Sequence, residues 1–338
     1  MTAPVTRRVA IPIIPEMPHA VPSAERIREF AGTTMGTTWS VRFVGSSASA
    51  QTVQRMIPRA LERVIAQMSP WEEQSDISRF NRLTLNQWQD LPPEFGRVMV
   101  SALRIAAESG GAYDPTMGAL VDLWGFGPGG ARASPPSPDE IDRRRRECGW
   151  RRLDLDAGAR RLRRSSYGLL DFCGIAKGFA VDLVAETLRE LGIHNALVEI
   201  GGELRGLGVK PDGSPWWVEI DRPARPKDNT AAEPILVALH QLAIATSGCE
   251  RGFTRGADHF SHTLDPRTGW PITNGMMTAT VLHRSCMEAD GYATALMVLG
   301  PDAGVDFAVR HQLAALILFR HGDAVMERTT PALDAMLA

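Results

Sequence analysis

The chain has 338 residues, and its composition is that of an ordinary globular protein, with 44% hydrophobic and 22% charged residues. Lysine and arginine total 37 against 39 for aspartate and glutamate, so the net charge of −2 excludes recruitment to nucleic acid or anionic lipid by overall charge. No apolar stretch reaches the roughly 18 residues of a membrane span. The four cysteines lack the CxxC spacing of zinc and redox motifs.

Residues 1–30 are interpreted as a poorly ordered N-terminal arm that precedes one domain over residues 31–330. Two arginines are followed by an apolar run that Pro12, Pro15 and Pro18 interrupt. A secretory signal would need about 7–15 uninterrupted apolar residues. The sequence therefore predicts a cytoplasmic protein, or a periplasmic one if the start is truncated.

The first half of the domain is predicted to mix strands and helices. Alternating side chains predict a strand over 37–45, and helical periodicity predicts helices over 53–68 and 92–111. The second helix starts at a proline pair and ends at a glycine pair, which is the usual punctuation. The polar stretch 69–82 between the two helices is interpreted as loop.

Residues 127–140 are rich in proline, serine and glycine, and this insertion is interpreted as a linker. Ser137 or Asp139 is expected to cap the arginine-rich helix after it. A hairpin turning at Ala157-Gly158 follows. Acidic residues interleave with the arginines of 143–164, so a solvated face is favoured there over a binding patch.

Short strands dominate the second half. The sequence GLLDF predicts one before a glycine turn, and a helix then runs from Lys177 to Gly192. Further strands are predicted at 195–202, 206–210, 216–220, 235–239, 242–248, 277–282 and 314–320, with a hairpin at 319–325. Runs of adjacent strands with segregated helices indicate an α+β fold of mainly antiparallel sheets with flanking helices.

The segment CMEADGYATALMVLG, residues 286–300, predicts a helix that carries a carboxylate among apolar positions. Asp290 and Thr294 are four residues apart and therefore lie on one helix face. A buried aspartate requires hydrogen-bond donors or a cation, so Asp290 either caps the helix or binds a metal ion. Two oxygen ligands suit Mg²⁺ but are too few, so further ligands must come from elsewhere.

Two other segments carry candidate chemistry. DFCGIAKG, residues 171–178, places Lys177 where a strand meets a helix, which favours either a phosphate site or a purely structural turn. His262 precedes the turn sequence DPRTG, which would hold it rigidly as a base near neutral pH; a surface turn is the alternative. Thr246 and Ser247 add polar groups at a strand end.

Taken in order, these segments strongly resemble the FAD:protein FMN transferases, the ApbE-type flavin transferases. The matching blocks are GTTMGTTWSV, MSPWEEQSDISRFN, GAYDPTMGALVDLWGFGP, LLDFCGIAKGFAVDLV, ALVEIGGELRGLG, ATSGCERGF, HTLDPRTGWPI and CMEADGYATALMVLG, from about residue 32 to about residue 300. The resemblance implies a flavin transferase domain of two interleaved halves, related to the T-fold.

The resemblance also implies an activity: Mg²⁺-dependent transfer of FMN from FAD to a threonine hydroxyl, or a serine hydroxyl, of an acceptor protein, with release of AMP. Asp290, Thr294 and the carbonyl of Gly174 would be the metal ligands, with Ca²⁺ and Mn²⁺ as alternatives to Mg²⁺. Lys177 would assist at the phosphate and His262 would take the proton of the acceptor hydroxyl.

The residues expected by the same resemblance to line the FAD site are Met35, Trp71, Ala112, Tyr113, Asp114, Asp171, Lys177, Asp182, Thr246, Ser247 and Leu264. Trp71 stands where the family usually has tyrosine, and an indole can stack on a flavin but lacks the phenol hydroxyl. Two alternatives therefore stay open: an FAD pyrophosphatase that yields FMN and AMP, and a flavin-binding protein without catalysis. Nucleic acid is not expected among its partners, and no membrane span is expected in the chain.

Overall fold

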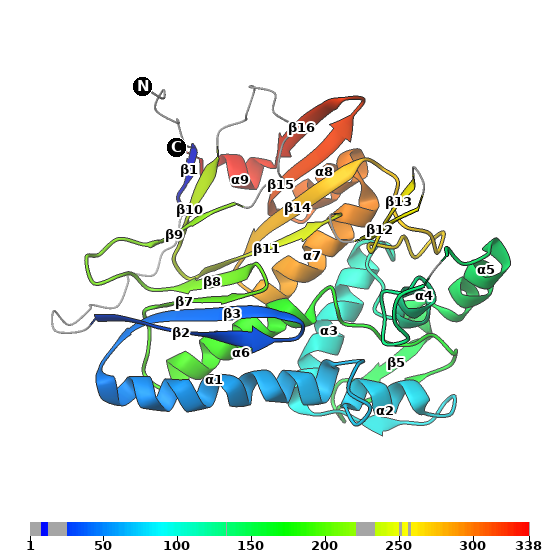
Figure 1. The fold of residues 1–338 in the computed structure, drawn as a ribbon, viewed down its shortest axis with the longest axis horizontal. Helices are drawn as coiled ribbons and strands as arrows, with labels where there is room; N and C mark the ends of the chain where they lie inside the picture. The colour runs from blue at the N-terminus through cyan, green and yellow to red at the C-terminus, as the bar shows by residue number, and fades with distance from the viewer. Residues whose placement is uncertain are drawn as a thin grey trace.

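An eight-stranded sheet organises the fold (Figure 1). The computed structural model describes residues 8–12, 26–132, 134–220, 234–249, 252–255 and 258–337. The strand order is β16-β15-β14-β11-β8-β7-β3-β2, and each neighbouring pair is antiparallel. The strands are β2 (Arg26–Thr34), β3 (Thr37–Gly45), β7 (Ala196–Ile200), β8 (Glu203–Leu207), β11 (Leu242–Gly248), β14 (Met276–His283), β15 (Ala314–His321) and β16 (Ala324–Thr329).

Helices cover one face of this sheet (Figure 1). The long helices are α1 (Ser47–Met68), α6 (Ala176–Glu190) and α7 (Cys286–Leu299), and α3 (Pro93–Glu108) packs against α7. The opposite face is covered by a three-stranded sheet of β1 (Arg8–Ala10), β10 (Ile235–Leu239) and β9 (Trp216–Glu219), together with α9 (Pro331–Asp334). The main sheet is therefore the middle layer of three.

Burial on both faces explains why the central strands are almost continuously apolar. In β11, Ala243 and Ala245 join the core under the helices, whereas Leu242 and Ile244 join the core on the other face. Successive side chains of a strand point to opposite faces, so a strand in the middle layer needs apolar residues at every position.

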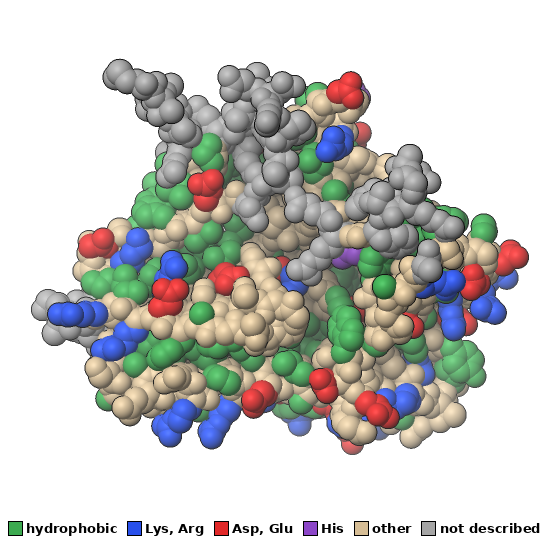
Figure 2. All heavy atoms as spheres, in the orientation of Figure 1, with side chains coloured by type: hydrophobic (Ala, Val, Ile, Leu, Met, Phe, Trp, Pro, Cys, Tyr) green, Lys and Arg blue, Asp and Glu red, His purple; other side chains and the backbone are tan. Residues whose placement is uncertain are grey.

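Most of the remaining elements come from the middle of the chain, whereas α8 (Pro301–Arg310) follows α7 and packs against it and against β15. The others are α2 (Asp76–Arg82), α4 (Gly118–Leu123), α5 (Pro138–Glu147), the 3₁₀ turn η1 (Trp150–Arg152), the small sheet of β4 (Gln89–Asp90), β6 (Arg161–Arg164) and β5 (Leu153–Asp156), and the hairpin of β12 (Gly252–Arg255) and β13 (Asp258–Ser261). On the face in Figure 2, acidic and basic side chains are interspersed. None of the described helices is long and apolar enough to cross a membrane.

The α+β prediction and most predicted elements are confirmed. Ser137, and not Asp139, caps α5, because its hydroxyl accepts a hydrogen bond from the N–H of Glu140 and the Glu140 carboxylate accepts one from the N–H of Ser137. The segment between α4 and α5 holds no helix or strand in its described residues before Pro138, which begins α5 within the range predicted as a linker.

Three predictions of secondary structure are wrong. The stretch 69–82 contains α2, whose N-cap Ser75 and buried Ile77 and Phe80 support a short helix. GLLDF forms no strand, because the Asn81 side chain bonds both the N–H and the C=O of Leu170 in place of a sheet partner. The strand expected at 206–210 begins earlier, at Glu203, and ends before Gly208.

The boundary predicted at residue 30 is also wrong. β2 begins at Arg26 and crosses it, and Arg8–Ala10 pairs in parallel with Ile235–Val237 of β10. Part of the supposed arm is thus built into two sheets. The remainder, residues 1–7 and 13–25, lies outside the described residues.

The helices α6 and α7 approach each other closely at Gly178. A Cβ atom built at Gly178 would lie 2.3 Å from the carbonyl oxygen of Cys286 and 2.8 Å from Cβ of Asp290. Only glycine permits the two helix backbones to approach this closely, because any side chain would overlap backbone atoms that cannot rotate away.

We expect Gly178→Ala to destabilise the protein by about 1–3 kcal/mol or more, because the new methyl group must push α6 and α7 apart. Gly96→Ala is the matched control, since Gly96 also lies within a helix but a Cβ there meets nothing within 4 Å. The control should gain about 0.5–1 kcal/mol from helix propensity. Urea unfolding of both variants measures the difference, and equal effects would contradict the close-packing argument.

Candidate active site

A cavity of about 940 Å³ opens where α6, α7 and the ends of β8 and β11 meet the loops after α1 and α3. This volume is at the upper end of the range for small-molecule sites. The predicted site residues that line it are Met35, Trp71, Ala112, Tyr113, Asp114, Asp171, Gly174, Lys177, Thr246, Ser247, His262, Leu264, Asp290 and Thr294. Every predicted site residue except Asp182 is therefore brought to one cavity.

Asp290 lies in the interior of α7 and faces α6. The N-cap of α7 is Ser285, so the interpretation of Asp290 as a helix cap is wrong. The Asp290 carboxylate is 3% exposed, and its Oδ2 accepts a hydrogen bond of 3.0 Å from the N–H of Gly178 in the first turn of α6. Burial raises the pKa of Asp290, although the charge of Lys177 and this N–H oppose the shift.

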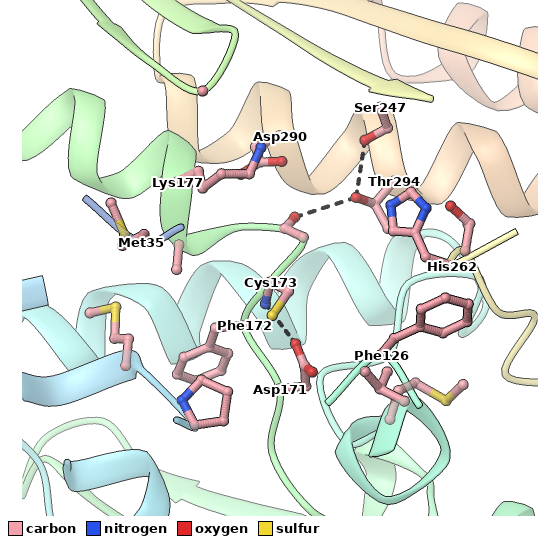
Figure 3. Close-up of a pocket in the computed structure, with 18 of the residues that line it drawn as sticks. Met35, Phe126, Asp171, Phe172, Cys173, Lys177, Ser247, His262, Asp290 and Thr294 are labelled. Carbon is pink, nitrogen blue, oxygen red and sulfur yellow. Dashed lines mark hydrogen bonds between the residues drawn. The ribbon is translucent and has the colours of Figure 1, made fainter. Parts of the chain in front are cut away.

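Thr294 lies one turn further along α7, beside the turn that leads into α6 (Figure 3). Its hydroxyl is 3.5 Å from the carbonyl oxygen of Gly174 and 3.3 Å from the hydroxyl of Ser247, at the end of β11. A Cβ at Gly174 would lie 2.8 Å from the Thr294 oxygen, so the absence of a side chain keeps this carbonyl accessible. Three oxygen atoms that could coordinate a metal ion therefore lie close together one turn from Asp290: those of the Thr294 hydroxyl, the Gly174 carbonyl and the Ser247 hydroxyl.

Lys177 points toward Asp290 and forms an ion pair with Glu203, the first residue of β8 (Figure 3 labels Lys177 and Asp290). Glu203 lines the cavity and is 2% exposed. Burial and the nearby charge of Asp290 raise the pKa of Glu203. Sequence reasoning missed this residue; its only signal was a glutamate directly after the Gly201-Gly202 turn.

Carboxylates outnumber cations in the cavity wall. The described lining residues include five carboxylates: Glu72, Asp114, Asp171, Glu203 and Asp290. Among the same residues, Lys177 is the only lysine or arginine. Such a wall repels an anionic ligand unless a cation neutralises it. The charge balance therefore favours a metal ion beside Asp290.

The donor set suits a hard divalent cation. Among the described residues, no three His, Cys, Asp or Glu side chains cluster as a transition-metal site would require. One carboxylate, one hydroxyl and one backbone carbonyl are typical of Mg²⁺, which usually combines few protein oxygens with phosphate and water. Asp290, Thr294 and Gly174 therefore fit such an ion.

His262 enters the cavity from the segment before the DPRTG turn. The Asp265 carbonyl accepts from the N–H of Gly269 at 2.7 Å, and the Asp265 carboxylate accepts from the N–H of Arg267 at 2.9 Å. The imidazole lies edge-on to the Phe126 ring, with 6.3 Å between their centroids. The predicted turn is present, and His262, which precedes it, contacts the Phe126 ring.

Tyr113, Asp114 and Asp171 also line the cavity. Asp114 accepts from the N–H of Thr116 at 2.8 Å and from that of Trp150 at 3.1 Å, whereas Asp171 accepts from the N–H of Cys173 at 2.6 Å. Burial raises the pKa of both carboxyls against the effect of these donors. The Tyr113 hydroxyl is buried and lacks a hydrogen-bond partner within the described structure.

Trp71 lies at the mouth of the cavity, and 56% of it is exposed. Its indole ring is therefore accessible to a ligand that enters the cavity. Its position is compatible with stacking on a planar ring.

The prediction that Asp182 lines the FAD site is wrong, because Asp182 is not among the residues that line the cavity. It is 3% exposed and forms an ion pair with Arg205. Its carboxylate accepts hydrogen bonds from the Ser285 hydroxyl at 2.7 Å and from the N–H groups of Cys286 and Met287, each at 3.0 Å. Asp182 therefore fastens the N-terminus of α7 to α6.

The chain is similar over most of its length to proteins of one known family. The model of the ApbE family matches residues 35–317. The FAD:protein FMN transferase of Vibrio cholerae is 37% identical, covering 93% of this chain and 94% of its own, and that of Haemophilus influenzae is 34% identical, covering 91% and 90%. The apo crystal structure of the flavinyl transferase ApbE from Pseudomonas stutzeri superposes with a TM-score of 0.85 at 36% identity, covering 92% of this chain and 97% of its own.

We expect Asp182→Asn to destabilise the protein by about 3–5 kcal/mol, because it leaves the Arg205 charge buried without its partner. Asp154→Asn is the control, since Asp154 pairs with Arg163 at the surface and its loss should cost at most about 1 kcal/mol. Chemical denaturation at pH 7 compares the two. A cost for Asp182→Asn as small as that of the control would show that this ion pair does not fasten α7.

Proposed function

This chain belongs to the ApbE family, and we propose that it is an FAD:protein FMN transferase that moves the FMN part of FAD onto a threonine or serine hydroxyl of an acceptor protein. The observation that carries the proposal is the convergence on one cavity of all the predicted site residues but Asp182. These residues come from segments far apart in the chain, and a cavity of about 940 Å³ has room for a dinucleotide.

The reaction is a phosphoryl-type transfer. The acceptor oxygen attacks the phosphorus on the FMN side of the pyrophosphate, and the bond from that phosphorus to the bridging oxygen breaks. The products are the FMN phosphoester of the acceptor and AMP, which leaves with the bridging oxygen. The hydroxyl proton must go to a base, and the additional negative charge on the phosphate oxygens must be stabilised.

His262 is the base in this proposal. It lies in the cavity wall, in the segment before the hydrogen-bonded DPRTG turn, and a neutral imidazole can accept the hydroxyl proton near neutral pH. Lys177 orients the phosphates from the other side of the cavity and stabilises their charge. Trp71 and Met35 are positioned to contact the planar rings of FAD at the cavity mouth.

Asp290, Thr294 and the Gly174 carbonyl would hold the divalent cation, with Mg²⁺ the expected ion. A bound cation would polarise the pyrophosphate and offset the negative charge of the cavity wall. The chain's own contribution is to hold these oxygens together, which it does by packing α7 against the turn before α6.

Replacing His262 with alanine should lower the rate of FMN transfer by about 10²–10⁴-fold, because proton removal from the acceptor loses its base. The affinity for FAD should change little. Single-turnover transfer and equilibrium FAD binding, measured on the same preparation, separate the two effects. A rate within about tenfold of the unaltered protein would assign the base to another residue.

The proposed function itself is tested by incubating the protein with FAD and Mg²⁺, with and without an acceptor domain carrying a flavinylation motif. AMP release and the intact mass of the acceptor are followed, and Asp290→Asn is expected to abolish both changes. Asp302→Asn, an exposed carboxylate on α8, is the matched control and should be fully active.

The outcomes distinguish the alternatives. An acceptor that gains one FMN, dependent on Asp290, supports the transferase. AMP and free FMN produced regardless of acceptor would indicate an FAD pyrophosphatase, for which the exposed Trp71 is the relevant feature. FAD binding without AMP would indicate a flavin-binding protein.

A further inference from the structure

Glu203 is a buried carboxylate in the cavity whose two oxygens have different surroundings. Oε1 pairs with Lys177, whereas Oε2 is buried and finds no hydrogen-bond partner in the described part of the chain. Buried polar atoms in native proteins are nearly always paired. An unpaired oxygen in the wall of a ligand cavity indicates a partner on the ligand.

The backbone fixes which face of the sheet carries the Glu203 side chain. Gly201 and Gly202, with φ of +62° and +100°, form the tight turn between β7 and β8, and Glu203 pairs in register with Ile200. Ile200 belongs to the core under the helices, so Glu203 faces α6 and the cavity. The preceding glutamate, Glu199, points away and bonds Ser40 and the N–H of Gly202.

The chemistry of the missing partner is restricted by charge. The ion pair with Lys177 opposes the rise in the pKa of Glu203 and favours its ionised form. An ionised Glu203 would repel a phosphate oxygen, so the partner must be a hydrogen-bond donor. Because Lys177 touches Glu203 and is assigned to the phosphates, this donor must lie within a few bonds of the pyrophosphate. In FAD, the hydroxyls of the ribityl chain and of the ribose meet that condition, whereas the donors of the flavin and adenine rings lie farther away.

We propose that Glu203 is a substrate-binding residue that accepts a hydrogen bond from a sugar-type hydroxyl next to the pyrophosphate, while its other oxygen holds Lys177. The inference rests on the proposed function, in that the ligand is FAD. Glu203 and Lys177 then act as a pair: the amine recognises the phosphates and the carboxylate recognises the neighbouring hydroxyl.

Calorimetric titration with FAD, FMN and ADP, in Mg²⁺ and without an acceptor, tests the proposal on Glu203→Gln. FMN carries the ribityl chain and ADP the ribose, and both carry phosphate. Losing the charged acceptor should raise the Kd of FAD about tenfold. The Kd of FMN should rise with it if the hydroxyl is on the ribityl chain, and that of ADP if it is on the ribose, leaving the other ligand unchanged.

Glu199→Gln, in the same hairpin but outside the cavity, is the control and should bind all three ligands normally. If Glu203 acted only by positioning Lys177, FMN and ADP would weaken together, which would overturn the proposal. Unchanged affinities in a folded variant, as judged by thermal melting, would overturn it too.

Two other outcomes, a variant that does not fold and a protein that does not bind FAD, also have a defined meaning. If Glu203→Gln does not fold, Glu203→Asp keeps the charge next to Lys177 but shortens its reach, and it should show the same selective loss. If the unaltered protein fails to bind FAD, the proposed function is contradicted and this inference with it; if it binds FAD and only the variant's selectivity is absent, the inference alone fails.

Discussion

The site depends on one buried contact, the hydrogen bond from the Gly178 N–H to the Asp290 carboxylate across the α6–α7 interface. It is possible because glycine lets the helix backbones approach until a Cβ would lie 2.3 Å from a carbonyl oxygen. The same contact orients Asp290 toward Lys177 and sets Thr294 beside the Gly174 carbonyl. A small displacement of α7 would separate these oxygens, because all of them are held by packing rather than by a covalent link.

The rest of the scaffold reinforces this interface. Asp182 fastens the start of α7 to α6, and Ser285 caps the same helix end. The wide sheet supports both helices from below, because β11 and β14 pack under α7 while β7 and β8 pack under α6. Residues that never touch the cavity therefore determine whether its ligands come together, as supporting residues commonly do in catalytic sites.

Burying the carboxylates of the site lowers the stability of the folded protein, and such a cost is typical of functional sites. Burial raises the pKa values of Asp114, Asp171 and Asp290, which means that folding works against their ionised forms. A folded protein keeps such groups when a ligand or cation makes use of their charge. The carboxylate excess in the cavity wall and the oxygen atoms near Asp290 suit the same proposed ligands, a divalent cation and the pyrophosphate of FAD.

The sequence alone determined the antiparallel α+β class and most strands and helices, because apolar periodicity is a local property of the chain. The set of residues that would meet in the cavity came from the resemblance of its ordered motifs to the family. The sequence also placed Asp290 and Thr294 on one helix face. It could not distinguish a capping aspartate from a buried one, since that depends on the position of Ser285 and the approach of α6. It assigned Asp182 to the ligand and overlooked Glu203, because a side chain's neighbours across a helix pair or a sheet are decided by tertiary packing, which no local pattern encodes.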